Sequence, residues 1–207
     1  ITAEQYPSFP GYPLTRITVK NDDSYTQPYG NIKGKSDPIR AEYSTINDEK
    51  THYREGDTRI YKMSLMLDPS WISDRRESPD IVMQFKRTQG QPDVFVEIKG
   101  KDMVVRIGDR EQMTIISDVE PGEWVDLFLK VKWSKKNGGR IEIAYRYSSK
   151  SETYRRSVNY TGPTIPSRAG KTYLKFGIYK PGRFANPPFP QEHILYITNF
   201  AILSPEI

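Results

Sequence analysis

The sequence predicts an all-β protein in which two antiparallel sheets pack face to face. Apolar and polar residues alternate in about ten to twelve short segments, which is the period of a half-buried strand. Turn residues such as Gly, Pro, Asn and Asp separate these segments about every ten residues. No segment shows the 3.6-residue apolar repeat of an amphipathic helix. With 207 residues, the chain is predicted to form one domain, residues 1–207.

The N-terminal part of the chain contains four predicted strands joined by polar connections. Ile17 and Val19 alternate with polar neighbours in the first, which is predicted to be an edge strand. The turn residues 36–38 precede the second strand, and Asp68-Pro69 end the third. The predicted strands are residues 15–20, 39–43, 59–67 and 81–87.

Seven further strands are predicted after residue 90. One pair is joined by the loop 135–139, in which Asn137-Gly138 predicts a hairpin turn with positive φ angles and a fixed register. A segment rich in Pro and Gly, residues 161–171, leads to the penultimate strand. The predicted strands are residues 94–98, 103–107, 113–119, 123–133, 140–147, 173–179 and 193–203.

The strand 173–179 has two faces of different character. One face is apolar and is expected to pack in the core, through Leu174, Phe176 and Ile178. The other face carries two phenols, a cation and a glycine, namely Tyr173, Lys175, Gly177 and Tyr179. Glycine weakens a strand unless something approaches its backbone closely. We therefore expect a ligand to lie across this second face.

Two earlier strands carry polar pairs whose members are two residues apart and so share a face: Arg40 with Glu42, and Gln84 with Lys86. The first pair could equally be an exposed salt bridge, and the second a solvated strand end. A sandwich of this size curves, and we expect these faces to meet the strand 173–179 in one concave groove.

Composition limits the classes of partner. There is no cysteine, so disulfides and thiolate chemistry are excluded. The chain has 31 Lys and Arg against 26 Asp and Glu, a formal charge of +5 that suits an anionic partner. Acidic residues are interspersed throughout, so nucleic acid is not predicted, and no apolar run reaches the ~18 residues that span a membrane. The 14 tyrosines suit sugar binding, although tyrosine is also a common strand residue.

The polar residues collected above suit β-elimination from a uronic acid better than hydrolysis. They contain no Ser-His-Asp arrangement, no phosphate loop and no pair of carboxylates for a glycoside hydrolase. In β-elimination a base removes the C5 proton, and the substrate carboxylate must be neutralised to stabilise the carbanion. Gln84, Lys86 and Arg40 have the chemistry to do this. Tyr179 is the predicted base and acid, with Lys175 or Lys86 lowering its pKa.

The same segments resemble the three motif strands of the jelly-roll polysaccharide lyases, which include alginate, heparin, glucuronan and ulvan lyases. Those families carry R-x-E, Q-x-H and Y-x-K-x-G-x-Y strands, in the order found here. The resemblance extends to residues 55–57 with Tyr61, and to residues 124–126 before a long strand. It implies a β-jelly-roll with a concave substrate groove and a secreted lyase that acts on an anionic polysaccharide.

Lys86 departs from the pattern because it stands where the second motif has histidine. The only histidines are His52 and His193, and a lone histidine is more often structural than catalytic. The combination of lysine and tyrosine is similar to that of jelly-roll ulvan lyases, in which a tyrosine serves as base and acid and a lysine offsets the carboxylate. The resemblance therefore favours ulvan as substrate, with glucuronan or alginate as alternatives. A non-catalytic carbohydrate-binding module is the alternative of another class.

The predicted site follows from these arguments. The catalytic residues are Tyr179, Lys86, Gln84 and Arg40, and the substrate-binding residues are Tyr173, Lys175 and Glu42. No cofactor is predicted. The acidic turns 21–23 and 47–49 offer oxygen ligands for a structural calcium, but short acidic turns are usually only turns. The protein is expected to be a secreted monomer without nucleic-acid or membrane partners. Four arginines could bind sulfate groups or could simply be solvated, namely Arg106, Arg146, Arg155 and Arg183.

Overall fold

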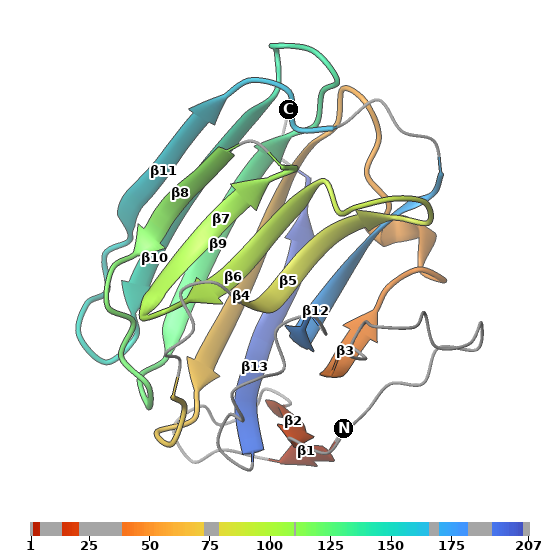
Figure 1. The fold of residues 1–207 in the computed structure, drawn as a ribbon. Coiled ribbons are helices and arrows are strands. Elements are labelled where there is room, and N and C mark those ends of the chain that lie inside the picture. Colours follow the sequence, from red (N-terminus) through yellow and green to blue (C-terminus); the bar gives the residue numbers. More distant parts are fainter. Residues whose placement is uncertain are drawn as a thin grey trace.

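Two stacked antiparallel sheets make up almost the whole structure (Figure 1). The computed structural model describes residues 2–4, 14–20, 39–72, 79–109, 111–165, 170–181 and 192–204. The seven-stranded sheet has the order β1 (Thr2–Glu4), β2 (Leu14–Lys20), β13 (Glu192–Leu203), β4 (Thr58–Leu67), β9 (Val125–Lys132), β10 (Arg140–Tyr147) and β11 (Arg155–Thr161). The six-stranded sheet has the order β3 (Ile39–Ser44), β12 (Thr172–Lys180), β5 (Asp80–Arg87), β6 (Val94–Lys99), β7 (Asp102–Ile107) and β8 (Glu111–Ile116). One 3-10 turn, η1 (Glu49–Thr51), precedes β4.

The apolar faces of the two sheets form one large core. Aromatic rings lie at its centre, where Tyr53 stacks on Trp133 with centroids 3.8 Å apart and Tyr61 meets Phe85 edge-on at 4.7 Å. The indole N–H of Trp133 donates to the hydroxyl of Tyr61 at 3.1 Å, so both buried polar atoms are paired. The apolar residues that were predicted to face inward from the strand 173–179 all lie in this core.

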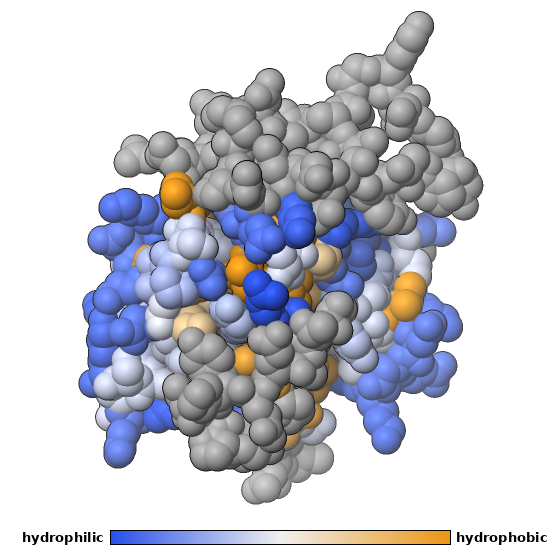
Figure 2. Space-filling view, turned by 90° about the horizontal axis from the view of Figure 1, so that it is seen from below, coloured by the Kyte–Doolittle hydropathy of each residue, from blue (hydrophilic) through white to orange (hydrophobic). Residues whose placement is uncertain are grey.

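Among the residues drawn in colour in the view from below, hydrophilic ones predominate at the sides, and hydrophobic ones show near the middle (Figure 2). Among the described residues there is no helix of the length and apolarity needed to cross a membrane.

The predicted all-β sandwich is confirmed, but two strands were not predicted, β1 and β11. In β11 the pairing with β10 is interrupted by a bulge between Ile143 and Ala144, and only Val158 of this strand is buried. The sequence of β11 therefore lacks the alternation that marks a strand. The prediction that residues 15–20 form an edge strand is wrong, because β2 lies between β1 and β13.

The hairpin between β9 and β10 forms in the predicted place, but its turn is different. None of residues 135–139 has a positive φ angle. Gly139 is needed for another reason, since a Cβ atom there would lie 2.3 Å from the carbonyl oxygen of Gly162.

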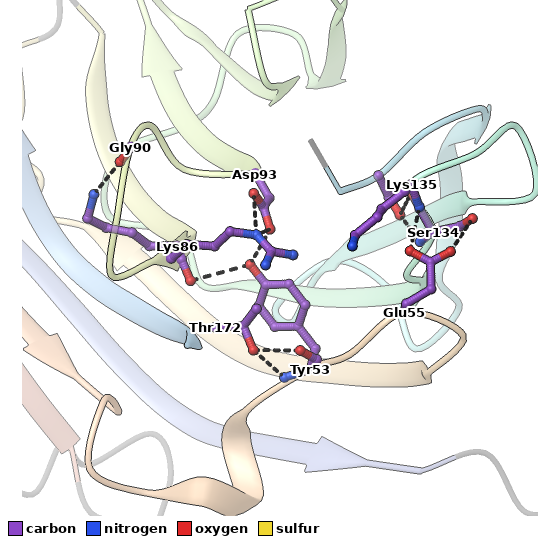
Figure 3. A network of polar contacts seen from close by, with 10 residues as sticks. Tyr53, Glu55, Lys86, Gly90, Asp93, Ser134, Lys135 and Thr172 are labelled. Atoms are coloured by element: carbon purple, nitrogen blue, oxygen red, sulfur yellow. Dashed lines mark hydrogen bonds and ion pairs between the residues drawn. The ribbon is translucent and has the colours of Figure 1, made fainter. Parts of the chain in front are cut away.

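Residues 55–57, which contributed to the family resemblance, have a structural role. The carboxylate of Glu55 accepts hydrogen bonds from Ser134 Oγ at 3.0 Å and from the backbone N–H of Lys135 at 2.8 Å (Figure 3). The backbone N–H of Gly56 donates to the carbonyl of Trp133 at 2.8 Å. This segment therefore anchors the start of the β9–β10 hairpin.

Candidate functional site

The three motif strands lie side by side in the six-stranded sheet, with β12 between β3 and β5. We call the side of these strands that points away from the core the motif face. The register pairs Tyr173 with Lys86, Lys175 with Gln84, Gly177 with Glu42, and Tyr179 with Arg40. The structure thus brings together the segments that carry all seven predicted site residues.

Glu42 is the centre of a hydrogen-bonded group on this face. Its carboxylate accepts a hydrogen bond from Gln84 Nε2 and forms an ion pair with Lys175 Nζ at 3.2 Å. The side chain of Glu42 is 5% exposed and that of Lys175 16%. The bond to Glu42 orients the amide of Gln84, which retains a second N–H for another acceptor. Glu42 thus positions Gln84 and Lys175.

Gly177 is required by the neighbouring strand. Its φ angle is +145°, and a Cβ atom there would lie 2.3 Å from the carbonyl oxygen of Ala41 and 2.8 Å from the Cα of Glu42. The sequence was interpreted as making room for a ligand, but the backbone of β3 is what approaches this glycine. The close approach of the two backbones at Gly177 fixes β3, which carries Glu42, against β12.

Tyr173 and Lys86 face each other and have pKa values shifted in opposite directions. Burial raises the pKa of the Tyr173 phenol, the Glu42 carboxylate adds to this, and Arg40 opposes it. Burial lowers the pKa of the Lys86 ammonium, as do Lys175 and Arg40, while Glu42 opposes the shift. The environment therefore shifts the equilibrium of both groups toward the uncharged form.

A second layer of residues holds Lys86 in place (Figure 3). The ammonium of Lys86 donates to the carbonyl of Gly90 at 2.9 Å, and the Tyr53 hydroxyl lies 3.5 Å from the Lys86 carbonyl. The same hydroxyl donates to the fully buried carboxylate of Asp93 at 2.8 Å, which also pairs with Arg87 at 3.1 Å. This layer was not predicted, because Tyr53 and Asp93 lie in connections where strand alternation carries no signal.

Tyr179 lies at the other end of the motif face from Lys86. Its ring is 5.9 Å from the guanidinium carbon of Arg40, its register partner on β3. Lys86 is the register partner of Tyr173. Tyr173 and Tyr179 are six residues apart on β12, which is about 20 Å between their Cα atoms at the rise of a strand. The sequence predicted Lys175 or Lys86 as the cation that lowers the pKa of Tyr179. For Lys86 this is wrong, because its register partner is Tyr173 and the cation beside the Tyr179 ring is Arg40.

Both histidines lie away from the motif face. His52 Nε2 is 3.1 Å from the carbonyl of Ile46. His193 is 1% exposed on β13 of the other sheet, where its ring lies 4.3 Å from that of Trp71 and its Nδ1 lies 3.4 Å from Asp80. Their positions indicate structural roles.

The described part of the chain contains no group of three or more His, Asp or Glu side chains that could hold a metal ion. In the acidic turn 47–49, Asp48 accepts a hydrogen bond from the backbone N–H of Lys50 at 3.1 Å and so caps η1. The other acidic turn, residues 21–23, lies outside the described residues, as does Arg183. The absence of a cofactor stays a prediction.

Arg106 is largely occupied within the protein. Its guanidinium lies 3.8 Å from the ring centroid of Phe95, pairs with Glu97 at 2.7 Å and donates to the carbonyl of Gly108 at 3.0 Å. These contacts account for the position of the Arg106 side chain without a bound sulfate.

The two buried glutamates of this sheet, Glu42 and Glu97, do not have the spacing of a glycoside hydrolase pair. Glu42 and Glu97 lie on β3 and β6, three strand intervals apart, which is about 14 Å. The two acids of a hydrolase are about 5 to 9.5 Å apart. Both carboxylates are also engaged, Glu42 by Gln84 and Lys175 and Glu97 by Arg106.

The comparisons with known proteins agree with this chemistry. A family model described as polysaccharide lyase matches residues 2–201. A search of curated proteins gave no match. Among solved structures, an endo-β-1,4-glucuronan lyase from the fungus Trichoderma reesei is similar with a TM-score of 0.70 at 15% identity, over 95% of this chain and 83% of that one.

Two further solved structures show how widely the fold is shared. An alginate lyase from Klebsiella pneumoniae has a TM-score of 0.54 at 8% identity, over 94% of this chain and 81% of that one. The catalytic domain of a glycoside hydrolase family 131 protein from Coprinopsis cinerea has a TM-score of 0.58 at 10% identity, over 94% of this chain and 71% of that one. At these identities the likeness shows the β-jelly-roll fold, and one such fold carries both lyases and a hydrolase.

Proposed function

The chain belongs to the polysaccharide lyase family, and we propose that its motif face cleaves a uronate-containing anionic polysaccharide by β-elimination. The family makes the protein a lyase that acts on a polysaccharide. The polymer and the roles of individual residues are the content of the proposal, and they rest on the geometry described above.

The observation that carries the proposal is the pairing of Tyr173 with Lys86. A base and an acid are recognised by environments that push their pKa values apart. The lowered pKa of Lys86 favours the free amine, which can accept the C5 proton, and the raised pKa of Tyr173 keeps the phenol protonated. As the C4–O4 bond breaks and the C4=C5 double bond forms, the Tyr173 phenol gives its proton to O4. Proton exchange with solvent then restores both groups.

The remaining polar groups would stabilise the substrate carboxylate and the carbanion. Arg40 and Lys175 supply positive charge, and the Gln84 amide, which donates one N–H to Glu42, has a second N–H to offer. Gln84 is buried and the Lys175 side chain is only 16% exposed, which strengthens these interactions, since the local dielectric is lower than that of water. Glu42 orients this set and keeps Lys175 paired until a substrate carboxylate arrives.

Tyr179 has a binding role in this account. It lies beside Arg40, and an aromatic ring next to a cation suits a sugar ring that carries a carboxylate. The sequence alone suggested Tyr179 as base and acid with Lys86 as a neutralising cation. We prefer Tyr173 as the proton-transfer residue because Tyr173, and not Tyr179, is opposite Lys86.

For the polymer we propose ulvan, because the lysine and tyrosine pair resembles that of the jelly-roll ulvan lyases. Glucuronan is the second candidate, since the Trichoderma structure with a TM-score of 0.70 is a glucuronan lyase. We also propose that the protein is secreted, because an anionic polysaccharide does not cross a membrane, and that it acts as a monomer.

Ultraviolet absorbance of the unsaturated product tests the function and identifies the substrate together. The protein is incubated with ulvan, glucuronan, alginate, heparin and a neutral glucan in separate reactions. We expect absorbance to rise with one acidic polymer and to stay flat with the neutral glucan. If no acidic polymer gives a product but one of them binds, the protein is a carbohydrate-binding module and the proposal is wrong.

A further inference from the structure

The seven-stranded sheet carries an aromatic and cationic surface on its outer side. Phe128 on β9 lies between Lys62 on β4 and Ala144 on β10 in the register of the sheet. Its neighbours Leu127 and Leu129 are 1% and 0% exposed in the core, so Phe128 points away from the core. Because the two sheets are stacked, this surface is on the opposite side of the sandwich from the motif face (Figure 1).

Two aromatic rings on this surface are held in a fixed arrangement. Tyr154, which is 40% exposed, meets Phe128 edge-on with centroids 6.4 Å apart. Lys62 Nζ lies 5.8 Å from the Phe128 centroid, and the Arg146 guanidinium lies 5.0 Å from the ring of Tyr154. Arg146 is itself fixed by Asp126 at 2.7 Å. The rings are therefore positioned before any ligand binds.

The charge of this surface is strongly positive. The outward-facing residues of β4, β9, β10 and β11 include six cations and two acids, a difference of 6 − 2 = +4 in a chain whose formal charge is +5. The cations are Lys62, Lys130, Lys132, Arg140, Arg146 and Arg156, and the acids are Asp126 and Glu142.

Both acids are already paired with arginines. Asp126 pairs with Arg146, and Glu142 pairs with Arg140 at 2.9 Å and Arg156 at 3.7 Å. Within the described part of the chain, none of the three lysines on this surface forms an ion pair. The lysine ammonium groups are thus available to an external anion, while a second copy of the same surface would be repelled.

We propose that this outer platform, formed by Lys62, Phe128, Lys130, Arg146, Tyr154 and Arg156, binds an anionic polysaccharide chain separately from the motif face. The rings of Phe128 and Tyr154 stack on sugar rings, and Lys62 and Lys130 meet carboxylates along the chain. Bound in this way, the enzyme stays on the polymer between cleavage events, which raises its effective concentration there. The choice of a uronate polymer as the ligand rests on the proposed function.

Affinity electrophoresis through gels containing ulvan or glucuronan tests the platform. The variant K62Q/Y154A changes one charge and one exposed ring, and K101Q is the matched control, because Lys101 is 79% exposed in the turn between β6 and β7. Both are made in the Y173F background to limit cleavage of the gel polymer. We expect K62Q/Y154A to bind the gel polymer about fivefold more weakly, because it lacks one exposed cation and one exposed ring. Equal retention of the two variants would overturn the proposal.

Three further measurements separate the platform from the proposed function and from another polyanion. Cleavage of a short uronate oligosaccharide by K62Q/Y154A without Y173F should equal that of the unmodified protein, because the motif face is intact. If the unmodified protein cleaves no polymer but K62Q/Y154A still weakens retention, the proposed function fails and the platform stands. Stronger retention in a gel containing single-stranded DNA than in any acidic polysaccharide, lost in K62Q/Y154A, would assign the platform to nucleic acid and overturn the proposal. Circular dichroism of each variant verifies the fold.

Discussion

Lys86 distinguishes this chain from the jelly-roll lyases that carry histidine in the second motif. A lysine with its ordinary pKa of about 10.4 is a poor base at neutral pH. Burial and the cations Lys175 and Arg40 lower the pKa of Lys86, which increases the fraction of free amine. The structure thus provides a physical reason why lysine can stand where related lyases have histidine.

Substitution of Lys86 tests whether it is a base or only a cation. Lys86→Arg retains the charge but cannot deprotonate, so we expect kcat to fall by about 100-fold or more. Lys86→His is the matched control, because imidazole restores a base, and we expect it to retain activity with an optimum at lower pH. Product absorbance over time measures both. Full activity in Lys86→Arg would mean that Lys86 neutralises the carboxylate and that a tyrosine is the base.

The pH dependence of kcat/KM follows from the same two groups. Activity requires Lys86 deprotonated and Tyr173 protonated. As pH rises, kcat/KM should increase through the pKa of Lys86, which is lowered, and decrease through the pKa of Tyr173, which is raised. We therefore expect a bell on the alkaline side of neutrality. A profile that only falls between neutral pH and alkaline pH would contradict these roles.

At the level of the strand, β12 depends on one glycine. Gly177→Ala would place a Cβ atom 2.3 Å from the carbonyl oxygen of Ala41 and would strain a residue whose φ is +145°. We expect the free energy of unfolding to fall by about 2 to 4 kcal/mol, with loss of activity because β3 and Glu42 move. Gly138→Ala is the control, since a Cβ atom there meets nothing within 4 Å. Denaturant midpoints that are equal for the two variants would show that β3 does not constrain Gly177.

The motif strands also show what a sequence can predict and what it cannot. Alternation alone identified the residues of β12 that face the core and those of the motif face, because side-chain direction has a period of two. The register could not be predicted in this way. The pairing of β12 with β5 contains an irregularity between Phe176 and Tyr179, and it depends on how distant segments fit together. For this reason the sequence left both Lys175 and Lys86 as candidates for the cation near Tyr179, whereas the register pairs Lys86 with Tyr173.

At the level of the whole molecule, a buried ionic group joins the two sheets. Lys180 on β12 and His193 on β13 both contact Asp80 on β5. Burial raises the pKa of Asp80, but the hydrogen bonds and charges of His193 and Lys180 lower it by more, and the net pKa is below its ordinary value. The sequence suggested no such group, because its three members lie far apart in the chain and each alone resembles an ordinary strand residue.

The buried group around Asp80 should make the free energy of unfolding sensitive to acid. A carboxylate with a lowered folded-state pKa stabilises the protein above its ordinary pKa of about 3.9, and this contribution is lost as pH falls below that value. Asp80→Asn should cost about 3 kcal/mol at pH 7 by leaving Lys180 buried beside a neutral group, and it should flatten the acid side of the stability curve. The exposed Asp118→Asn is the control. Denaturant unfolding between pH 3 and pH 7 measures both, and an unchanged acid limb in Asp80→Asn would rule out this role.

A comparison of Tyr173→Phe with Tyr179→Phe tests whether proton transfer occurs at Tyr173, opposite Lys86. The measurement is the rate of product absorbance on the polymer that the unmodified protein cleaves, with circular dichroism to verify folding. We predict a loss of kcat of about 100-fold or more for Tyr173→Phe. For Tyr179→Phe we predict mainly a higher KM, because that ring binds sugar beside Arg40. Full kcat in Tyr173→Phe together with loss of kcat in Tyr179→Phe would contradict the account and return the acid and base roles to Tyr179.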